Sequence, residues 1–208
     1  MTSVGWPAGL SMSSPRAVDL IAQLALQPHP EGGWYREIYR SPTVVQTARG
    51  SRSALTTIYY LLEATQVSRW HVVQGDEIWH HYAGAPLELL AYTPGSRSFE
   101  RRVIEPVGTE LTGAELIAGT PEADVAHFDV DLTSTLNFPA FAAAAQRSEV
   151  VSVIPTGVWQ AARSMGEYTL VGCTVGPGFE FADFEFVSAL AGHREHFVGD
   201  LSPYAGLL

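Results

Sequence analysis

Ser68-Arg-Trp-His-Val-Val-Gln-Gly-Asp-Glu-Ile-Trp-His-His-Tyr-Ala-Gly84 is the stretch of sequence that decides the fold. Both halves carry several β-branched and aromatic residues, and Gln74-Gly75-Asp76 separates the halves with residues that favour a tight turn. The stretch therefore predicts two antiparallel strands joined as a hairpin. Because side chains along a strand alternate between its two faces, each strand presents every second residue to the same side.

Ionisable and aromatic side chains gather on one face of this predicted hairpin. We expect His71 and Glu77 to meet across it. If that face lines the inside of a barrel, a guanidinium, an imidazole, a carboxylate and an indole all point into one polar cavity. The alternation assigns the following residues to the face: Arg69, His71 and Val73 on the first strand, and Glu77, Trp79 and His81 on the second.

The rest of the chain has the pattern of an all-β protein. From Trp34 onward, short runs of β-branched, aromatic and alternating residues are separated by Gly, Pro, Asn and Asp. A looser segment between Gly108 and Arg147 contains two short helical candidates, at 113–118 and 140–146. Strands are predicted at 34–39, 55–62, 68–73, 77–83, 87–93, 100–104, 125–131, 149–154, 160–163, 168–175 and 184–187.

The N-terminal region predicts a tail followed by one short helix. Residues 1–14 are rich in Gly, Ser and Pro and are expected to form a flexible tail. A helix is predicted from Pro15 to Leu26, with Ser14 as its cap and its apolar residues largely on one face. Residues 15–208 are then expected to form a single domain.

Composition and charge exclude several classes of protein. The chain has 208 residues, and its 12 basic and 22 acidic side chains give a formal charge of −10, which repels nucleic acid. No apolar run reaches the roughly 20 residues of a membrane helix, and the N-terminus lacks the pattern of a secretion signal. The single cysteine, Cys173, lies in an apolar run and predicts a buried thiol. We therefore expect a cytoplasmic protein without nucleic-acid or membrane partners.

The hairpin resembles the first motif of the cupin superfamily, which runs Gly, five residues, His-x-His, three or four residues, Glu, six residues, Gly. His71 takes the position of the second histidine, and Glu77 takes that of the glutamate with one extra residue in the turn. Gly84 closes the motif, whereas Arg69 stands where the first histidine is expected. The hairpin thus matches the motif in all but one of its ligand positions.

A later stretch, Pro155-Thr-Gly-Val-Trp-Gln160, resembles the second cupin motif, Pro-x-Gly-x-x-His-x-x-x-Asn. Gln160 occupies the histidine position of that motif, and Ser164 occupies the asparagine position. The chain therefore departs from the pattern at a second ligand position.

Five stretches are similar to one branch of the superfamily, the uncharacterised family called DUF985 or Cupin_5. The resemblance implies a cupin jelly-roll β-barrel, or double-stranded β-helix, and a homodimer, but no agreed activity. Relative to a typical member, the chain has an insertion at about 108–148. The stretches are His29-Pro-Glu-Gly-Gly-Trp-Tyr-Arg-Glu37, Ile58-Tyr-Tyr-Leu-Leu62, Asp76-Glu-Ile-Trp-His80, residues 153–162, and Val171-Gly-Cys-Thr-Val-Gly-Pro-Gly-Phe-Glu-Phe181.

Metal binding is one expectation for a cupin. Transition-metal sites usually combine three or four His, Asp, Glu or Cys ligands. Only His71 and Glu77 match by position, since Gln160 offers a neutral oxygen and Arg69 cannot ligate while charged. The hypothesis of a divalent metal (iron, manganese, nickel or zinc) held by His71, Glu77 and Gln160 stays open, with His81 as a substitute ligand.

Without a metal, the same residues suit acid/base chemistry on a small ligand. His71 and Glu77 are the candidate acid and base, and Arg69 is the candidate clamp for a carboxylate or phosphate. Residues expected to complete the substrate-binding set are Trp79, Tyr59, His81 and Gln160.

Three functions follow from these residues. The leading hypothesis is an enzyme that isomerises or epimerises a small polar or carbohydrate-like molecule. The alternatives are a metal-dependent oxygenase and a non-catalytic binding protein. His29, before Pro30, is expected to shape a turn, with a smaller chance of reaching the pocket rim. The sequence does not identify the substrate.

Overall fold

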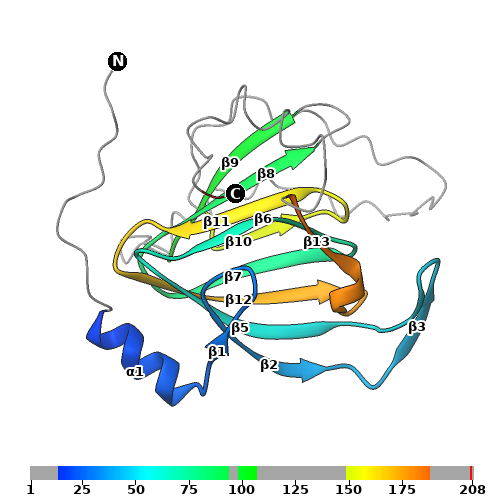
Figure 1. The fold of residues 1–208 in the computed structure, drawn as a ribbon, viewed down its shortest axis with the longest axis horizontal. Helices are drawn as coiled ribbons and strands as arrows, with labels where there is room; N and C mark the ends of the chain where they lie inside the picture. Colours follow the sequence, from blue (N-terminus) through cyan, green and yellow to red (C-terminus); the bar gives the residue numbers. More distant parts are fainter. Residues whose placement is uncertain (1–13, 94–97, 107–148, 188–206, 208) are drawn as a thin grey trace, which may run out of the picture. The chain divides into compact units, whose positions relative to one another are not determined.

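The computed structural model describes residues 14–93, 98–106, 149–187 and 207. The described strands form two large antiparallel sheets and one small hairpin (Figure 1). The six-stranded sheet has the order β1 (Gln27–Pro28), β2 (Trp34–Arg40), β5 (Thr56–Glu63), β12 (Tyr168–Gly176), β7 (Asp76–Gly84) and β10 (Val151–Ile154). The five-stranded sheet has the order β13 (Phe184–Phe186), β6 (Val67–Val73), β11 (Trp159–Ser164), β8 (Leu87–Thr93) and β9 (Ser98–Ile104).

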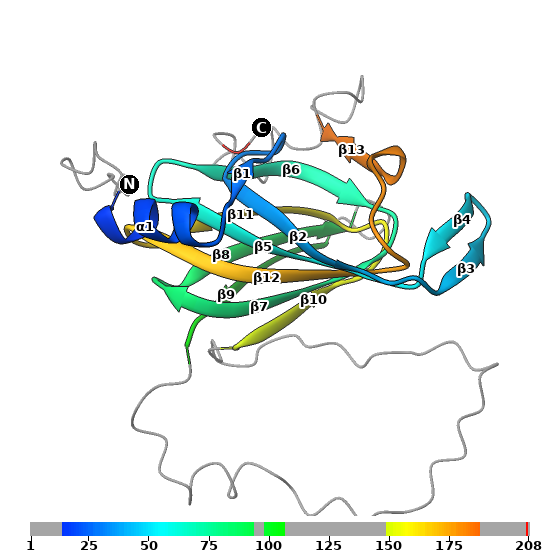
Figure 2. The ribbon, with the colours of Figure 1, turned by 90° about the horizontal axis from the view of Figure 1, so that it is seen from below.

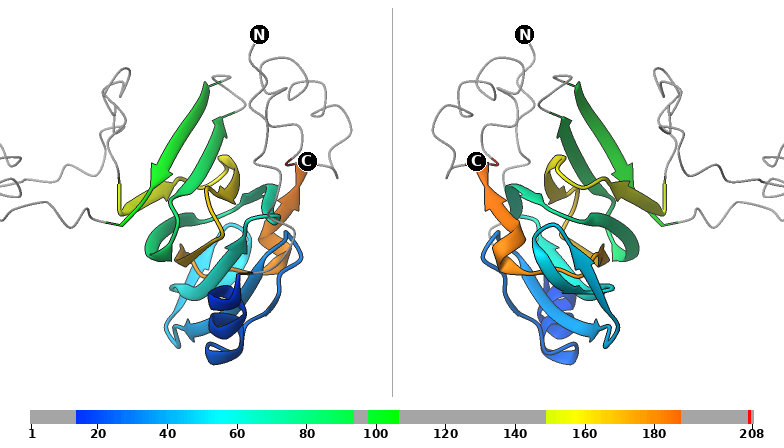
Figure 3. Two further views of the ribbon diagram at one scale, coloured as in Figure 1. Left: turned by 90° about the vertical axis from the view of Figure 1, so that its left-hand side faces the viewer. Right: turned by 90° about the vertical axis from the view of Figure 1, so that its right-hand side faces the viewer.

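The main hydrophobic core lies between the two large sheets. Tyr60, Leu62 and Trp79 of the six-stranded sheet pack in one cluster with Leu87 and Leu89 of the five-stranded sheet. The end-on views of Figure 3 show the strands of both sheets around this common interior. The all-β jelly-roll prediction is confirmed: two antiparallel sheets face each other, and their inward-facing apolar residues share one core. Each sheet can bury its apolar face only against the other.

One helix, α1 (Pro15–Gln23), precedes the described strands. Its buried Ala17 and Leu20 pack against Leu61 and Leu170 of the six-stranded sheet, as its apolar face predicts. Ser14 makes no side-chain cap; its hydroxyl instead donates to Glu167 Oε2 at 2.9 Å, so the expected capping bond was wrong. No helix in the described part of the chain is long and apolar enough to span a membrane.

The hairpin of β3 (Val44–Thr47) and β4 (Gly50–Ser53) projects from the end of the six-stranded sheet opposite to α1 (Figure 2). The sequence pattern did not predict these two strands or the two-residue β1. Ten predicted strands are confirmed within two residues at their boundaries. The predicted hairpin at 68–84 was wrong, because β6 and β7 lie in different sheets and do not pair: β6 pairs with β11 and β13, and β7 pairs with β12 and β10. The predicted strand at 125–131 and both helical candidates lie outside the described residues.

A β-bulge in β6 changes which residues face the interior. Gln160 of β11 pairs with His71 and Ala162 pairs with Ser68, so three steps along β6 match two steps along β11. The extra residue places Ser68 on the same face as His71 and leaves Arg69 exposed. The expectation that Arg69 shares the inner face was therefore wrong, because strict alternation fails at a bulge.

Candidate functional site

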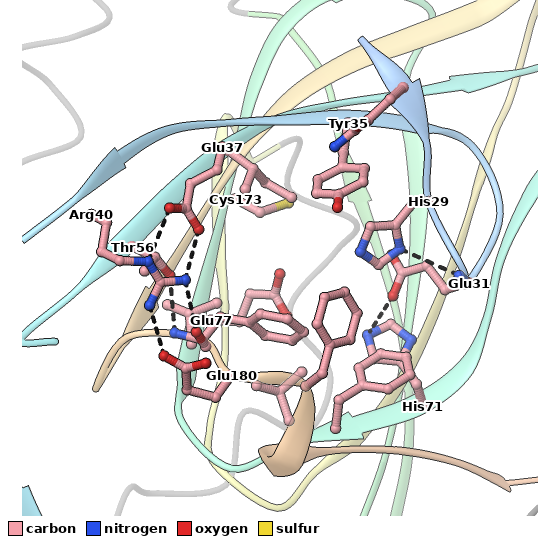
Figure 4. A pocket seen from close by; sticks show the side chains of 17 residues that line it. His29, Glu31, Tyr35, Glu37, Arg40, Thr56, His71, Glu77, Cys173 and Glu180 are labelled. Atoms are coloured by element: carbon pink, nitrogen blue, oxygen red, sulfur yellow. Dashed lines mark hydrogen bonds and ion pairs between the residues drawn. The ribbon is translucent and has the colours of Figure 1, made fainter. Parts of the chain in front are cut away.

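A cavity of about 160 Å³ opens between the inner face of the six-stranded sheet, β6, and the segment from Phe179 to Phe184 (Figure 4). This segment contains the 3-10 helix η1 (Phe181–Asp183), which precedes β13. The residues that line the cavity are Gln27, His29, Glu31, Tyr35, Glu37, Arg40, Thr56, Ile58, His71, Val73, Glu77, Cys173, Val175, Phe179, Glu180, Phe181 and Phe184.

A tight loop between β1 and β2 carries Glu31 into the cavity wall. Gly32 has a φ of 114°, and a Cβ at this position would lie 2.0 Å from the carbonyl oxygen of Val67, so only glycine fits. The Tyr60 hydroxyl donates to the Gly32 carbonyl at 2.8 Å, and the Arg69 amide donates to the Glu31 carbonyl at 3.1 Å. These contacts hold the loop against β5 and β6.

Glu31 is a buried carboxyl group with two polar contacts on β6. Its Oε1 accepts a hydrogen bond from the Ser68 hydroxyl at 3.1 Å, and its Oε2 lies 3.3 Å from His71 Nε2. Burial raises the pKa of Glu31 above its ordinary value, while His29 and the hydroxyls of Tyr60 and Ser68 lower it in part. Burial likewise lowers the pKa of His71. Both shifts favour an uncharged Glu31–His71 pair.

The tautomer of His71 follows from its neighbours. His71 Nδ1 lies 2.7 Å from the Arg69 carbonyl oxygen, which can only accept, so the proton of the neutral ring sits on Nδ1. His71 Nε2 is then an acceptor, which the Gln160 amide nitrogen approaches at 3.1 Å. A protonated Glu31 supplies the second donor that faces this nitrogen.

Gln160 connects His71 to Glu77, and Trp79 sets its orientation. The Trp79 indole can only donate, and it donates to Gln160 Oε1 at 3.1 Å. The amide nitrogen must therefore face the two acid–base groups, donating to Glu77 Oε2 and to His71 Nε2. The four side chains form one buried network.

Glu77 is the buried carboxyl group at the centre of the cavity wall. Burial raises its pKa to about 7, although His71, Gln160 and Cys173 lower it in part. Burial and the neighbouring Glu77 also raise the pKa of the Cys173 thiol well above its ordinary value. Cys173 therefore stays protonated and donates to Glu77, which disfavours a nucleophilic role. Glu77, by contrast, exchanges a proton near neutral pH.

His29 places a second neutral imidazole at the cavity. Its Nδ1 accepts a hydrogen bond from the Glu31 amide at 3.3 Å, so its proton sits on Nε2. The other ring nitrogen, Nε2, faces the cavity in Figure 4. Burial lowers the pKa of His29, and the edges of Tyr35 and Tyr60 pack around the ring at centroid distances of 4.5 and 5.8 Å. His29 can thus donate one hydrogen bond to a ligand.

An ion-pair network lines the opposite, more exposed end of the cavity. Arg40 donates to both oxygens of Glu37, at 3.0 and 2.8 Å, and to Glu180 at 2.9 Å. Figure 4 shows this group across the cavity from His29, Glu31 and His71. Asp183 lies in the neighbouring segment 179–184. It accepts from Arg52 at 2.7 Å and from Arg49 at 3.0 Å, and these ion pairs hold the segment in place.

The structure divides the residues expected in the site into two groups. His71 and Glu77 line the cavity, and Trp79 and Gln160 lie directly behind them. The remaining three, Arg69, Tyr59 and His81, do not belong to the lining.

Arg69, Tyr59 and His81 have other surroundings. Arg69 is exposed, donates to the Pro30 carbonyl at 2.7 Å and lies 4.6 Å from the ring centroid of Phe186. Tyr59 lies in the cluster beneath α1, on the outer face of β5. His81 is buried on the inner face and its Nε2 bonds the Ala85 carbonyl at 3.0 Å. The anion-clamp role of Arg69 finds no support in this arrangement.

The donor set of the cavity does not fit a metal ion. At the cupin ligand positions only His71 and Glu77 carry metal-binding groups, and Gln160 turns its amide nitrogen toward them. Turning its oxygen inward would break the bond from Trp79. Among the residues that the structure describes, no cluster of three His, Cys, Asp or Glu side chains has the geometry to hold a metal.

The sequence analysis did not predict several lining residues of the stretch 29–37, Glu31 and Glu37 among them. Tyr35 and Glu37 alternate on β2 and both face inward, which the period-2 pattern allows. Glu31 lies in a loop, where no periodic signal exists. Its two neighbouring glycines were the available signal, because they allow a sharp turn with positive φ.

The fold and the cavity define a jelly-roll protein with a partly enclosed pocket lined by ionisable and aromatic side chains. The chain matches the family described as "Cupin superfamily (DUF985)" over residues 18–187, and it belongs to this family, Cupin_5.

Two solved structures have a similar fold over nearly the whole length of both chains. A hypothetical protein from Leishmania major is 25% identical, with a TM-score of 0.61, covering 92% of this chain and 96% of that one. A protein from Shewanella oneidensis is 26% identical, with a TM-score of 0.60, covering 90% and 95%. The sequence has no significant match among curated proteins.

Proposed function

We propose that this protein is an enzyme that moves a proton at the carbon next to a carbonyl group, isomerising or epimerising a small hydroxy-carbonyl compound. One observation carries the proposal. The Glu77 carboxyl group and the His29 imidazole line the same cavity, and other side chains or backbone groups hold each of them in place. A base and a hydrogen-bond donor fixed around one ligand are the minimum that such a reaction needs.

Glu77 has the properties of the base. Gln160 holds its Oε2, which leaves the carboxyl group oriented without neutralising it. A base works best when its pKa lies near the working pH, and burial brings the pKa of Glu77 to about 7. Above that pH the carboxylate can accept a proton from carbon, and the resulting acid can return it.

His29 has the properties of the hydrogen-bond donor. Its neutral ring carries the proton on Nε2, as the bond from the Glu31 amide to Nδ1 requires. A neutral imidazole can polarise a carbonyl oxygen in a buried site without the cost of burying a charge. Glu31 and His71, behind this position, share one proton and support the same uncharged state.

The reaction proceeds in two balanced steps. Glu77 takes the proton from the carbon next to the carbonyl, the C–H electron pair forms a carbon–carbon double bond, and the carbonyl π pair moves to oxygen. That oxygen is stabilised by the hydrogen bond from His29 Nε2 and becomes an enol when it accepts the proton. In the second step Glu77 delivers its proton to the former carbonyl carbon, the hydroxyl on the first carbon gives its proton to the His29 ring, and the oxygen electron pair forms the new carbonyl group. Epimerisation instead requires the enediol to turn over before Glu77 returns the proton to the first carbon.

Deuterium exchange tests the proposal. The protein is incubated at pH 8 in D2O with dihydroxyacetone, hydroxyacetone and glyceraldehyde, and loss of the C–H signals is followed by proton NMR. We expect catalysed exchange that falls at least about 100-fold in Glu77→Gln, because the base is removed. His29→Gln is expected to lower the rate as well.

Glu63→Gln is the matched control, since Glu63 is also buried but lies outside the cavity lining. It is expected to keep the wild-type rate. Binding of these compounds without exchange would overturn the proposal in favour of a non-catalytic binding protein. Full activity in Glu77→Gln, or failure of all three compounds to bind, would also overturn it.

A further inference from the structure

The cavity contains several carboxyl groups and few cations. Its lining includes Glu31, Glu37, Glu77 and Glu180, whereas Arg40 carries the only guanidinium among the lining residues. Even with Glu31 and Glu77 protonated, the two remaining carboxylates outnumber the one guanidinium. The charge of the lining therefore opposes the entry of an anion.

The guanidinium of Arg40 is already occupied. Its Nε and one Nη2 hydrogen bind the two oxygens of Glu37, and its Nη1 binds Glu180. The Phe179 carbonyl accepts from Nη2 as well, at 3.2 Å. Four of the five N–H groups of this side chain thus have acceptors within the protein. A carboxylate or phosphate would have to displace Glu37 or Glu180 to gain the forked contact that arginine normally offers an anion.

The arginines next to the cavity are engaged in the same way. Arg52 donates to both oxygens of Asp183, at 2.7 and 2.9 Å, and Arg49 donates to Asp183 at 3.0 Å. Arg49 also donates to the Gln74 carbonyl. Neither arginine belongs to the cavity lining.

At the inner end of the cavity, the groups that face a ligand are neutral or acidic. Burial lowers the pKa of His29 and of His71, so both rings are uncharged at neutral pH. Glu77 next to them accepts hydrogen bonds from hydroxyl groups, and its ionised form repels anions. Hydroxyl and carbonyl groups satisfy these partners without introducing a charge.

The volume of the cavity limits the ligand to a small molecule. A cavity of about 160 Å³ holds a molecule of about six non-hydrogen atoms, such as benzene. Three-carbon hydroxy-carbonyl compounds have this size, whereas a sugar nucleotide does not fit inside it.

We propose that the site selects small uncharged hydroxy compounds and rejects anions, with Glu37 and Glu180 as the residues that determine this specificity. Both act by occupying Arg40, which would otherwise bind a carboxylate or phosphate. This inference names the substrate class of the proposed enzyme and rests on that function for its chemistry, but it is tested by binding alone.

Lactamide and lactate are suitable probes, because they have the same number of non-hydrogen atoms and differ in charge. Ligand-observed NMR titrations measure their dissociation constants with the wild-type protein and with a Glu37→Gln, Glu180→Gln double variant. We expect wild type to bind lactamide at least about tenfold more tightly than lactate. The double variant should bind lactate at least about tenfold more tightly than wild type does, with lactamide affinity within about threefold.

Glu100→Gln is the control, because it breaks an ion pair with Arg102 away from the cavity. It should leave both affinities unchanged. Equal binding of lactate and lactamide by wild type, no gain for lactate in the double variant, or no binding of either probe would overturn the inference. If the proposed enzymatic function is wrong and this inference is right, the wild type still prefers lactamide to lactate, but it catalyses no deuterium exchange.

Discussion

The amide of Gln160 determines how the buried acid–base groups share their protons. Because Trp79 donates to its oxygen, its two N–H groups face Glu77 and His71. His71 must then carry its proton on Nδ1, where the Arg69 carbonyl accepts it. A neutral amide at this position holds Glu77 in place without the strong downward shift in pKa that a cation would cause.

At the residue scale, we predict that the unfolding free energy of Glu77→Gln rises relative to that of wild type as pH rises from 5 to 8. The pKa of Glu77 is raised from 4.5 to about 7, so the folded state binds the extra proton within this window. Its contribution to stability is full below about pH 4.5 and is lost as pH rises to about 7. The difference in unfolding free energy should change by about 3 kcal/mol at most, measured by urea denaturation.

The comparison with wild type at each pH reduces the contribution of Glu31 and His71, which titrate in both proteins, although the pKa of His71 is lower without the charge of Glu77. The Glu63→Gln variant provides a second reference, since it removes a buried carboxyl group elsewhere. A difference between Glu77→Gln and wild type that stays constant from pH 5 to pH 8 would show that the pKa of Glu77 is not raised.

At the element scale, two irregular features build the site from regular strands. The bulge in β6 brings Ser68 to the inner face, and the glycine-rich turn between β1 and β2 brings Glu31 next to it. Each feature depends on the other, because the Glu31 carbonyl accepts the amide of Arg69 at the bulge. The site thus lies where two breaks in strand geometry meet.

We predict that Gly32→Ala lowers the unfolding free energy by at least about 3 kcal/mol. The new Cβ would lie 2.0 Å from the Val67 carbonyl oxygen, and the φ of 114° is unfavourable for alanine. The turn must then move away from β6 and take Glu31 with it, so lactamide binding should also weaken. Thermal and urea unfolding and the NMR titration measure these effects.

Gly157→Ala is the matched control, because Gly157 also has a positive φ, of 76°, but nothing lies within 4 Å of its Cβ position. It should cost only about 1 to 2 kcal/mol. Similar losses in the two variants would mean that backbone strain alone, rather than contact with β6, requires glycine at position 32.

At the scale of the whole molecule, the described strands form a unit interrupted by residues 107–147. The backbone meets again across this interruption, where the Glu105 amide donates to the Glu149 carbonyl at 2.9 Å. Ile104 also forms a parallel bridge with Glu149. The two ends of the interruption are therefore neighbours in the fold.

We predict that a chain with residues 108–147 replaced by a six-residue Gly/Ser linker folds and binds lactamide with unchanged affinity. A shorter connection lowers the entropic cost of bringing its two ends together, which should raise the unfolding free energy by about 1 to 2 kcal/mol. Circular dichroism, urea unfolding and NMR titration measure the outcome. An unfolded product, or one that loses the ligand, would show that the segment contributes to the core or to the site.

Homodimerisation and a cytoplasmic location stay predictions, and light scattering at micromolar concentration tests the first.

The sequence by itself determined the all-β class, the order of ten strands and the presence of His71 and Glu77 at one cavity. The two residues reach it from facing sheets and not across the predicted hairpin. Strand alternation and turn residues are local signals, and they remain valid wherever the pleat is regular. The short β1 and the β3–β4 hairpin gave too weak a pattern for the same treatment.

Only the tertiary structure decided which groups complete the site. The bulge in β6 removed Arg69 from the inner face and placed Ser68 there, where it bonds Glu31, because one extra residue reverses the faces that alternation assigns. Glu31 and His29 arrive from a turn that has no periodicity, and Arg40 meets Glu180 from a position 140 residues away in the chain. Such contacts depend on how distant strands are placed together, which no local pattern of residues encodes.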